Sequence, residues 1–175
     1  MKTLIILSMA MALLASPSWG YKQEDLDKLA ATNTCQKCDL AGADLYLAYL
    51  REANLTKANL EKAILTKANL AGADLRGTVL GVAFLPLADL READLQRVDL
   101  SHASLRGADL AGANLERANL EQADLAGADL AGADLRGTVL TGAVLRDAKI
   151  DFADFTKAKF CNTVMPDGQR IFRDC

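Results

Sequence analysis

The sequence predicts an all-β solenoid made of many short turns, and two columns of residues lead to this fold class. Starting at Leu40, every fifth residue is Leu through Leu145, which is 22 consecutive positions, and Ile150, Phe155 and Phe160 continue the column. Two residues before each of these lies a small residue, which is Ala at 21 of 25 positions. A step of five residues rotates an α-helix by about 500°, so this period forms no apolar stripe on a helix. Short extended segments that turn every five residues place both columns on one side of the chain.

The exceptions in the Ala column indicate the size of one coil. Four of its members are not Ala, and they are separated by 40, 20 and 40 residues: Cys38, Thr78, Val98 and Thr138. The block at residues 71–80 also recurs unchanged at residues 131–140, a shift of 60. All of these spacings are multiples of 20, which predicts a physical repeat of four pentads per coil.

Residues 1–20 precede the repeat and have the layout of a secretory signal peptide. Lys2 stands before an uncharged run of about 12 residues, and Ser18 and Gly20 are small residues at the −3 and −1 positions of a cleavage after Gly20. This run is shorter than the roughly 20 residues that cross a bilayer. We therefore expect an exported protein, periplasmic or extracellular, with no membrane span after cleavage; an uncleaved anchor is the alternative.

Residues 21–35 form the lead-in to the repeat. Within them, residues 23–32 place Leu26 and Leu29 on one side among charged residues. This pattern predicts a short amphipathic helix that caps the first coil.

The repeat units themselves resemble the pentapeptide-repeat family. Units such as Ala43-Asp44-Leu45-Tyr46-Leu47 follow its motif of a small residue, Asp or Asn, Leu or Phe, and two variable residues. The similarity covers residues 36–162, and Asp or Asn precedes the central residue in 16 of 25 units. The resemblance implies a right-handed quadrilateral β-helix of about six coils.

Residues 163–175 are expected to cap the other end of the rod. Pro166-Asp167-Gly168 predicts a turn, after which Ile171 and Phe172 can fold back over the last coil.

The four cysteines flank the repeat, and export would permit disulfides between them. Coils about 4.8 Å apart place the two ends about 29 Å from each other, well beyond disulfide reach. We therefore expect Cys35 to pair with Cys38, and Cys161 with Cys175. The resemblance adds that secreted members of the family often carry cysteine-flanked ends.

The residues that could support catalysis or a cofactor do not form a known constellation. Cys35-Gln36-Lys37-Cys38 matches a thiol-redox spacing, but that chemistry uses a helix start beside a βαβ unit, which the pattern lacks. Asp39 stands where c-type haem attachment requires His, and the separation of the cysteine pairs argues against a zinc site. His102 is the only histidine and falls at an outward position. We expect no enzyme activity, cofactor, metal or small-molecule substrate.

The charge balance of 20 Lys and Arg against 23 Asp and Glu argues against nucleic-acid binding. Columns of Asp could imitate DNA phosphates, and the resemblance includes relatives that bind DNA gyrase as DNA mimics. However, Arg76, Arg91 and Arg136 lie on the same faces as these Asp columns, so the field is mixed. A DNA-mimic regulator and a CxxC redox protein remain the alternative functions.

The most unusual surface feature is apolar. Ile64, Phe84, Ser104 and Val144 stand on one face where Asp or Asn is expected. Together with neighbouring outward residues, the expected surface comprises Tyr46, Leu47, Tyr49, Ile64, Val82, Phe84, Pro86 and Leu87. Large apolar patches commonly mark interaction sites. The sequence therefore predicts a non-catalytic structural or protein-interaction module, with an unknown protein partner or a second copy bound around Phe84 and Leu87.

Overall fold

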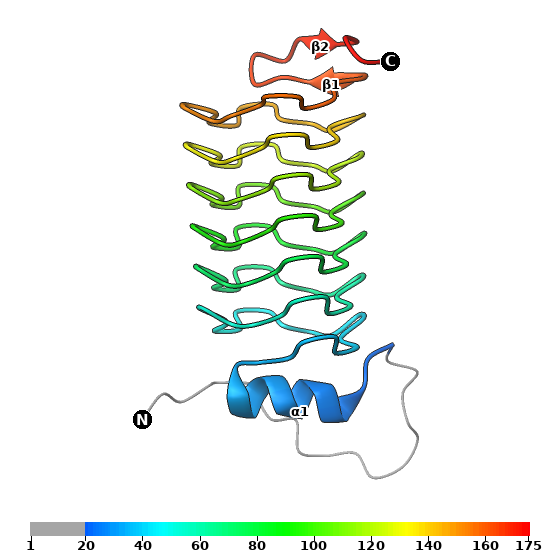
Figure 1. The fold of residues 1–175 in the computed structure, drawn as a ribbon, viewed down its shortest axis with the longest axis vertical. Coiled ribbons are helices and arrows are strands. Elements are labelled where there is room, and N and C mark those ends of the chain that lie inside the picture. Colours follow the sequence, from blue (N-terminus) through cyan, green and yellow to red (C-terminus); the bar gives the residue numbers. More distant parts are fainter. Residues whose placement is uncertain (1–19) are drawn as a thin grey trace.

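The computed structural model describes residues 20–175, so the predicted signal segment lies outside the described residues except for Gly20. Figure 1 shows a straight rod of stacked coils with a helix, α1 (Gln23–Thr32), across one end. A hairpin of β1 (Thr163–Val164) and β2 (Arg170–Ile171) lies at the other end. Within the described part of the chain, no helix is long and apolar enough to cross a membrane.

Each coil pairs with the next through parallel β-bridges between residues 20 positions apart, in a ladder that covers residues 34–164. The central residue of a pentad donates its N–H to one neighbouring coil, as Leu60 does to the Val79 carbonyl at 2.7 Å. The residue before it donates to the other neighbour, as Asn59 does to the Cys38 carbonyl at 2.8 Å. Four pentads therefore complete one coil, as the spacing of the exceptional small residues predicts.

The corners between pentads require positive φ at the last residue of each unit. Gly77 adopts φ 64°, which costs glycine little, whereas Lys57 adopts φ 58° at the equivalent corner of the neighbouring coil. Left-handed backbone costs a non-glycine residue about 1–2 kcal/mol. The ladder offsets this cost, because the Lys57 N–H donates to the Arg76 carbonyl at 3.0 Å.

The core consists of the two columns seen in the sequence. Leu60 and Leu110 are fully buried, and so are Ala58 and Ala108 beside them in the small column. Thr78 replaces Ala in this column without leaving a polar group unpaired, since its hydroxyl donates to the Leu55 carbonyl at 2.9 Å. Stacking identical small residues lets every coil have the same cross-section, which keeps the rod straight.

The N-terminal cap combines α1 with a disulfide. Leu29 of α1 is fully buried on the first coil, and the helix ends at Asn33, whose left-handed backbone (φ 55°) lets its N–H donate to the Leu29 carbonyl. The Asp25 carboxylate accepts the Asp39 N–H at 2.8 Å, which joins the helix to the first coil. Beneath the helix, Cys35 and Cys38 form a disulfide.

The C-terminal cap is the β1–β2 hairpin with the tail that follows it. A disulfide joins Cys161 and Cys175, so both pairs match those expected from the sequence. Ile171 packs against the core, but Phe172 is 63% exposed and does not cover the last coil as expected. The reason is strand geometry, because neighbouring residues of an extended segment point to opposite sides.

Candidate interaction surface

Most outward positions before the central Leu hold Asp or Asn because these side chains brace the following corner. The Asp99 carboxylate accepts the Ser101 N–H at 3.0 Å, and Asp44 accepts the Tyr46 N–H at the same distance. An Asp or Asn side chain that bonds the backbone two residues onward stabilises a turn. An apolar residue at this position cannot accept this hydrogen bond, and its side chain remains exposed to solvent.

The structure brings Ile64 and Phe84 together on one side of the rod. They pair directly in the ladder, between Asp44 on one side and Ser104 on the other. Ile64 is 41% exposed and Phe84 51% exposed. Both side chains therefore present apolar surface that the fold itself does not use.

Two corners of the coil that carries Phe84 extend this surface. Val82, on the corner before Phe84, is 42% exposed, and Leu87, on the corner after it, is 57% exposed. Leu87 lies over the next coil at Gly107, where an added Cβ would be 2.9 Å from the Leu87 Cδ2. We call the set Ile64, Val82, Phe84 and Leu87, with the half-buried Pro86, the Phe84 surface.

The remaining predicted residues lie apart from the Phe84 surface. Tyr46 and Leu47 are exposed on a corner of the first coil. The Leu47 N–H donates to the Thr66 carbonyl and the Lys67 N–H to the Pro86 carbonyl. The polar pair Thr66 and Lys67 thus separates the first-coil corner from the corner that carries Leu87.

Two further exposed apolar residues lie near this end of the rod. Tyr49 is exposed on the adjoining side, where it pairs with Asn69. Val79, which was not among the residues predicted from the sequence, is 39% exposed on the side that precedes Val82. Its signal was available, because Val79 also stands where Asp or Asn is expected.

Ion pairs gather on the side that contains Tyr49 and on the side that follows it along the chain. The guanidinium groups of Arg76 and Arg136 lie 2.6 Å from Asp74 and Asp134, respectively. The hydrogen bond from Arg136 lowers the pKa of the Asp134 carboxyl below its usual value, and Arg76 has the same effect on Asp74. Arg91 makes the equivalent pair with Asp89 at 2.7 Å. These pairs neutralise the carboxylate columns, which are therefore not open anionic ladders.

Among the described residues, one group of side chains that could ligate a metal ion lies in the N-terminal cap. Asp25, Cys35 and Cys38 bring one potential ligand atom each within 4.8 Å of one another. Metal binding requires thiolates, but Cys35 and Cys38 are joined in a disulfide and buried. His102 is exposed on a corner of a different coil and does not join this group.

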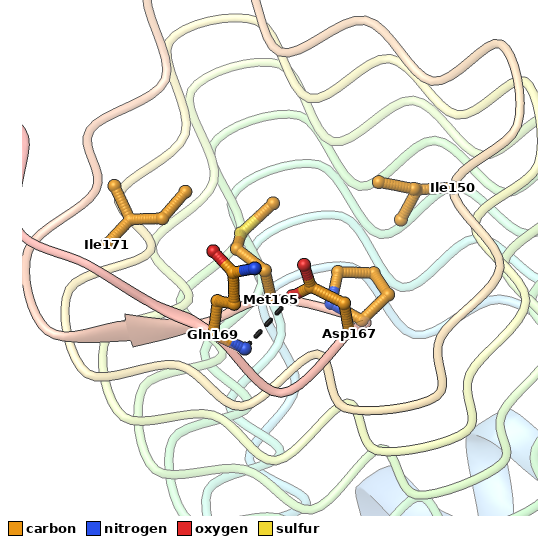
Figure 2. A pocket seen from close by; sticks show the side chains of 6 residues that line it. Ile150, Met165, Asp167, Gln169 and Ile171 are labelled. Atoms are coloured by element: carbon orange, nitrogen blue, oxygen red, sulfur yellow. Dashed lines mark hydrogen bonds between the residues drawn. The ribbon is translucent and has the colours of Figure 1, made fainter.

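Two hollows lie on the described surface, away from the Phe84 surface. One, of about 210 Å³, is polar and lies between the side chains of Arg51, Glu52, Arg91 and Glu92. The other, of about 380 Å³, lies at the C-terminal end, and Figure 2 shows Ile150 and Ile171 at either side with Met165 between them.

The stacked pentads define this chain as a repeat solenoid. The family described as pentapeptide repeats matches it in 8 copies, over residues 34–66, 43–81, 87–122 and 123–162. The chain belongs to the pentapeptide repeat family. This finding confirms the resemblance seen in the sequence.

Several solved structures are similar to this chain. HetL, a pentapeptide repeat protein involved in heterocyst differentiation regulation from the cyanobacterium Nostoc sp. strain PCC 7120, is 36% identical, with a TM-score of 0.48, over 79% of this chain and 72% of HetL. A pentapeptide repeat protein from the Arabidopsis thaliana thylakoid lumen is 31% identical, with a TM-score of 0.29, over 43% of this chain and 59% of its own. QnrB1, a plasmid-mediated fluoroquinolone resistance protein, is 22% identical, with a TM-score of 0.31, over 73% of this chain and 62% of its own. No curated protein matches the chain.

Proposed function

We propose that this chain is a non-catalytic, exported protein-interaction module that binds a protein partner through the Phe84 surface. The observation that carries the proposal is the direct pairing of two half-exposed apolar residues, Ile64 and Phe84, at positions that elsewhere hold Asp or Asn. The scaffold would be a right-handed quadrilateral β-helix, which the family membership and the 20-residue pairing support.

The composition of the Phe84 surface favours an apolar group on the partner. Val82, Phe84, Pro86 and Leu87 project from one side of a single coil and from the two corners that flank it. Ile64 lies on the same side of the rod, on the neighbouring coil nearer to α1. Aromatic side chains such as that of Phe84 are enriched at protein interfaces, and the buried centre of an interface is more apolar than the surrounding surface. Asp44 and Ser104, which bound the surface along the ladder, would form part of a polar rim.

Export is supported by the cysteines. Both pairs are oxidised, and stable structural disulfides are typical of proteins outside the cytosol. The signal segment that would direct export is a prediction from the sequence and belongs to this proposal.

The two alternative functions are less well supported. Gyrase mimicry requires an anionic surface, whereas Arg76, Arg91 and Arg136 each pair with a carboxylate of the ladder. Thiol-redox exchange requires an accessible nucleophilic sulfur, whereas Cys35 is fully buried and Cys38 is 3% exposed.

The test is photo-cross-linking in the native host with the reactive residue placed at position 84, and at position 129 as the control on a polar side. A discrete adduct at 84 that is absent at 129, and is lost when Leu87 is changed to Asp, supports the proposal. Adducts at both positions, or at neither, contradict it. Circular dichroism of Phe84→Asp should show an unchanged fold, because the side chain is half exposed and leaves the core columns intact.

A further inference from the structure

Two lysines lie beside the Phe84 surface on the neighbouring coil nearer to α1. The Lys62 N–H donates to a carbonyl of the corner that holds Val82, at 3.0 Å, so Lys62 adjoins that end of the surface. The Lys67 N–H donates in the same way to the corner that holds Leu87, also at 3.0 Å. Both lysines are exposed at the tips of their corners. Each end of the Phe84 surface therefore has a cation next to it.

The coil on the other side of the Phe84 surface adds a third cation. The Leu87 N–H donates to the Arg106 carbonyl at 3.0 Å, so Leu87 lies between the corners of Lys67 and Arg106. The remaining adjoining corner holds the exposed His102, next to Val82. Leu87 thus has a cation on both neighbouring coils, and Val82 has one.

The carboxylates of the rod neutralise these cations only in part. The Lys62 Nζ lies 2.9 Å from Glu61, and the Arg106 guanidinium lies 2.9 Å from Asp124, one coil further along the rod. Lys67 makes no ion pair with any residue in the part of the chain that the structure describes. Exposed ion pairs contribute little to stability, so a carboxylate from a partner can replace the one that the rod supplies.

The positive charge is a local feature. On the side and the two corners that adjoin the Phe84 surface, the two neighbouring coils carry three cations and one carboxylate, Glu61, which leaves two positive charges. The whole chain, in contrast, has a net charge of −3. An apolar surface with cations at both ends is complementary to apolar side chains that have carboxylates on either side.

A second copy of the chain does not suit this arrangement of charges. In a pair related by a two-fold axis parallel to the rod, Lys62 of one copy would lie over Lys67 of the other. An axis in the interface but perpendicular to the rod would place Lys67 over Arg106. Like charges that face each other oppose association. The charges therefore favour an anionic partner over a second copy.

An anionic bilayer is less complementary than a peptide segment. A bilayer presents a continuous layer of negative charge, and this layer would also face the carboxylates of Asp44 and Asp124 on the same side of the rod, and that of Glu61 beside Lys62. A peptide presents separate carboxylates, which can lie against the cations and avoid these three residues.

We propose that the Phe84 surface binds an acidic segment of a partner protein, with apolar side chains at its centre and Asp or Glu on both sides. This inference rests on the proposed function and specifies the chemistry of the partner. The apolar side chains would pack on Phe84 and Leu87. The carboxylates would pair with Lys62 at one end and with Lys67 and Arg106 at the other. Five extended residues reach about 17 Å, so a short segment suffices to cross a side that is one pentad long.

Selection from a library of random nine-residue peptides displayed on phage tests the chemistry of the partner. The bait is the chain from residue 21, and peptides that also bind Phe84→Asp are removed. We expect the remaining peptides to have apolar residues at the centre and Asp or Glu on both sides. Failure to enrich any such peptide would overturn the inference. Peptides that depend on Phe84 but lack flanking acids would also overturn it, while leaving the proposed function in place.

Lys67→Glu tests the role of charge, and Lys57→Glu is the matched control. Both lysines are exposed on corners of the same coil with φ of 57° and 58°, but Lys57 lies at the diagonally opposite corner. Fluorescence anisotropy with an enriched acidic peptide should give a Kd at least about tenfold higher for Lys67→Glu and an unchanged Kd for Lys57→Glu. The same peptide with Lys in place of its flanking acids should prefer Lys67→Glu to the native chain. Equal effects of the two variants would overturn the inference.

Three further results would assign the Phe84 surface to a different occupant and overturn the inference. One is binding to phosphatidylglycerol vesicles that Lys67→Glu abolishes, without any peptide that depends on Phe84. Another is a dimer, measured by sedimentation, that Phe84→Asp disrupts. The third is a specific cross-link from position 84 to a partner segment without acidic residues, which would retain the proposed function and reject only the acidic partner.

Discussion

Single residues in this rod act through their place in the pentad. An Asp before the central Leu braces the next corner with its carboxylate, as Asp99 does for Ser101. Where an Arg follows, the same carboxylate also holds the guanidinium, as Asp134 holds Arg136 at 2.6 Å. Phe84 lacks this brace, yet its coil keeps the same ladder bonds, with the Phe84 N–H on the Ala63 carbonyl at 2.9 Å. The ladder therefore tolerates loss of the brace at individual positions, which frees those positions for other side chains.

The inner small column is expected to be the least tolerant part of the repeat. Ala108→Leu adds three heavy atoms at a fully buried position between neighbouring coils. We expect the free energy of unfolding to fall by at least about 1–3 kcal/mol, because an overfilled core forces side chains and backbone apart. Denaturant unfolding measures the loss. Ala126→Leu, at a corner position that is only half buried, is the control and should change stability little; equal losses in both variants would show that the column is not space-limited.

At the scale of elements, the two caps stabilise the ends of the rod. α1 covers the first coil with Leu29. At the C-terminal end, the Asp174 carboxylate accepts the Phe160 N–H, a bond that a backbone carbonyl of the next coil makes elsewhere in the rod. The Arg173 guanidinium lies 4.8 Å from the centre of the Phe160 ring and adds a cation–π contact to the same side. Both caps thus use a carboxylate to accept a backbone N–H of the adjoining coil, Asp25 at one end and Asp174 at the other, and the N-terminal cap adds the fully buried side chain of Leu29.

The C-terminal cap should therefore be sensitive to acid. The hydrogen bond from the Phe160 N–H lowers the pKa of Asp174. A carboxyl whose pKa is lower in the folded state stabilises the fold above its unfolded pKa, near 4, and this contribution is lost as the pH falls through the folded pKa. Hydrogen exchange of the Phe160 amide should accelerate below about pH 4, relative to the intrinsic rate. Asp174→Asn should remove this pH dependence; an unchanged dependence in the variant would assign it to another carboxyl.

The two disulfides should differ in their response to reductant. Cys175 is exposed and Cys161 half buried, whereas Cys35 and Cys38 lie in the core. Limited reduction followed by alkylation and mass spectrometry should label Cys161 and Cys175 first. The double Ser variant of this pair should lower the free energy of unfolding by about 3 kcal/mol, since the bond closes a loop of 14 residue steps. Earlier labelling of Cys35 and Cys38 would show that the N-terminal cap opens more readily.

At the scale of the whole molecule, the rod is a stack of equivalent coils that contact only their neighbours. Its ladder runs in one register over residues 34–164, and every pair is separated by 20 residues. The surface features are local by comparison, since the Phe84 surface belongs to the coils near α1 and the β1–β2 hairpin belongs to the C-terminal end.

Removal of one whole coil tests this equivalence. Deletion of residues 111–130 joins two pentads in register and keeps both caps and the Phe84 surface. Small-angle scattering should show a folded rod shorter by about 4.8 Å, the spacing of neighbouring strands. Unfolding should remain cooperative at lower stability, because one interface between coils is lost. An unfolded product would mean that the coils are not equivalent units.

The five-residue period by itself determined the solenoid and its inner columns, and the 20-residue spacing of the exceptions in the Ala column determined the size of the coil. It also indicated Ile64, Phe84 and Leu87 as outward apolar residues. The tertiary structure decided which of these meet. Stacking by 20 residues joins Ile64 to Phe84 but places Thr66 and Lys67 between Leu47 and Leu87. The contact of the tail with Phe160, through Asp174, was likewise decided by the tertiary structure, since long-range backbone bonds have no local pattern in the sequence.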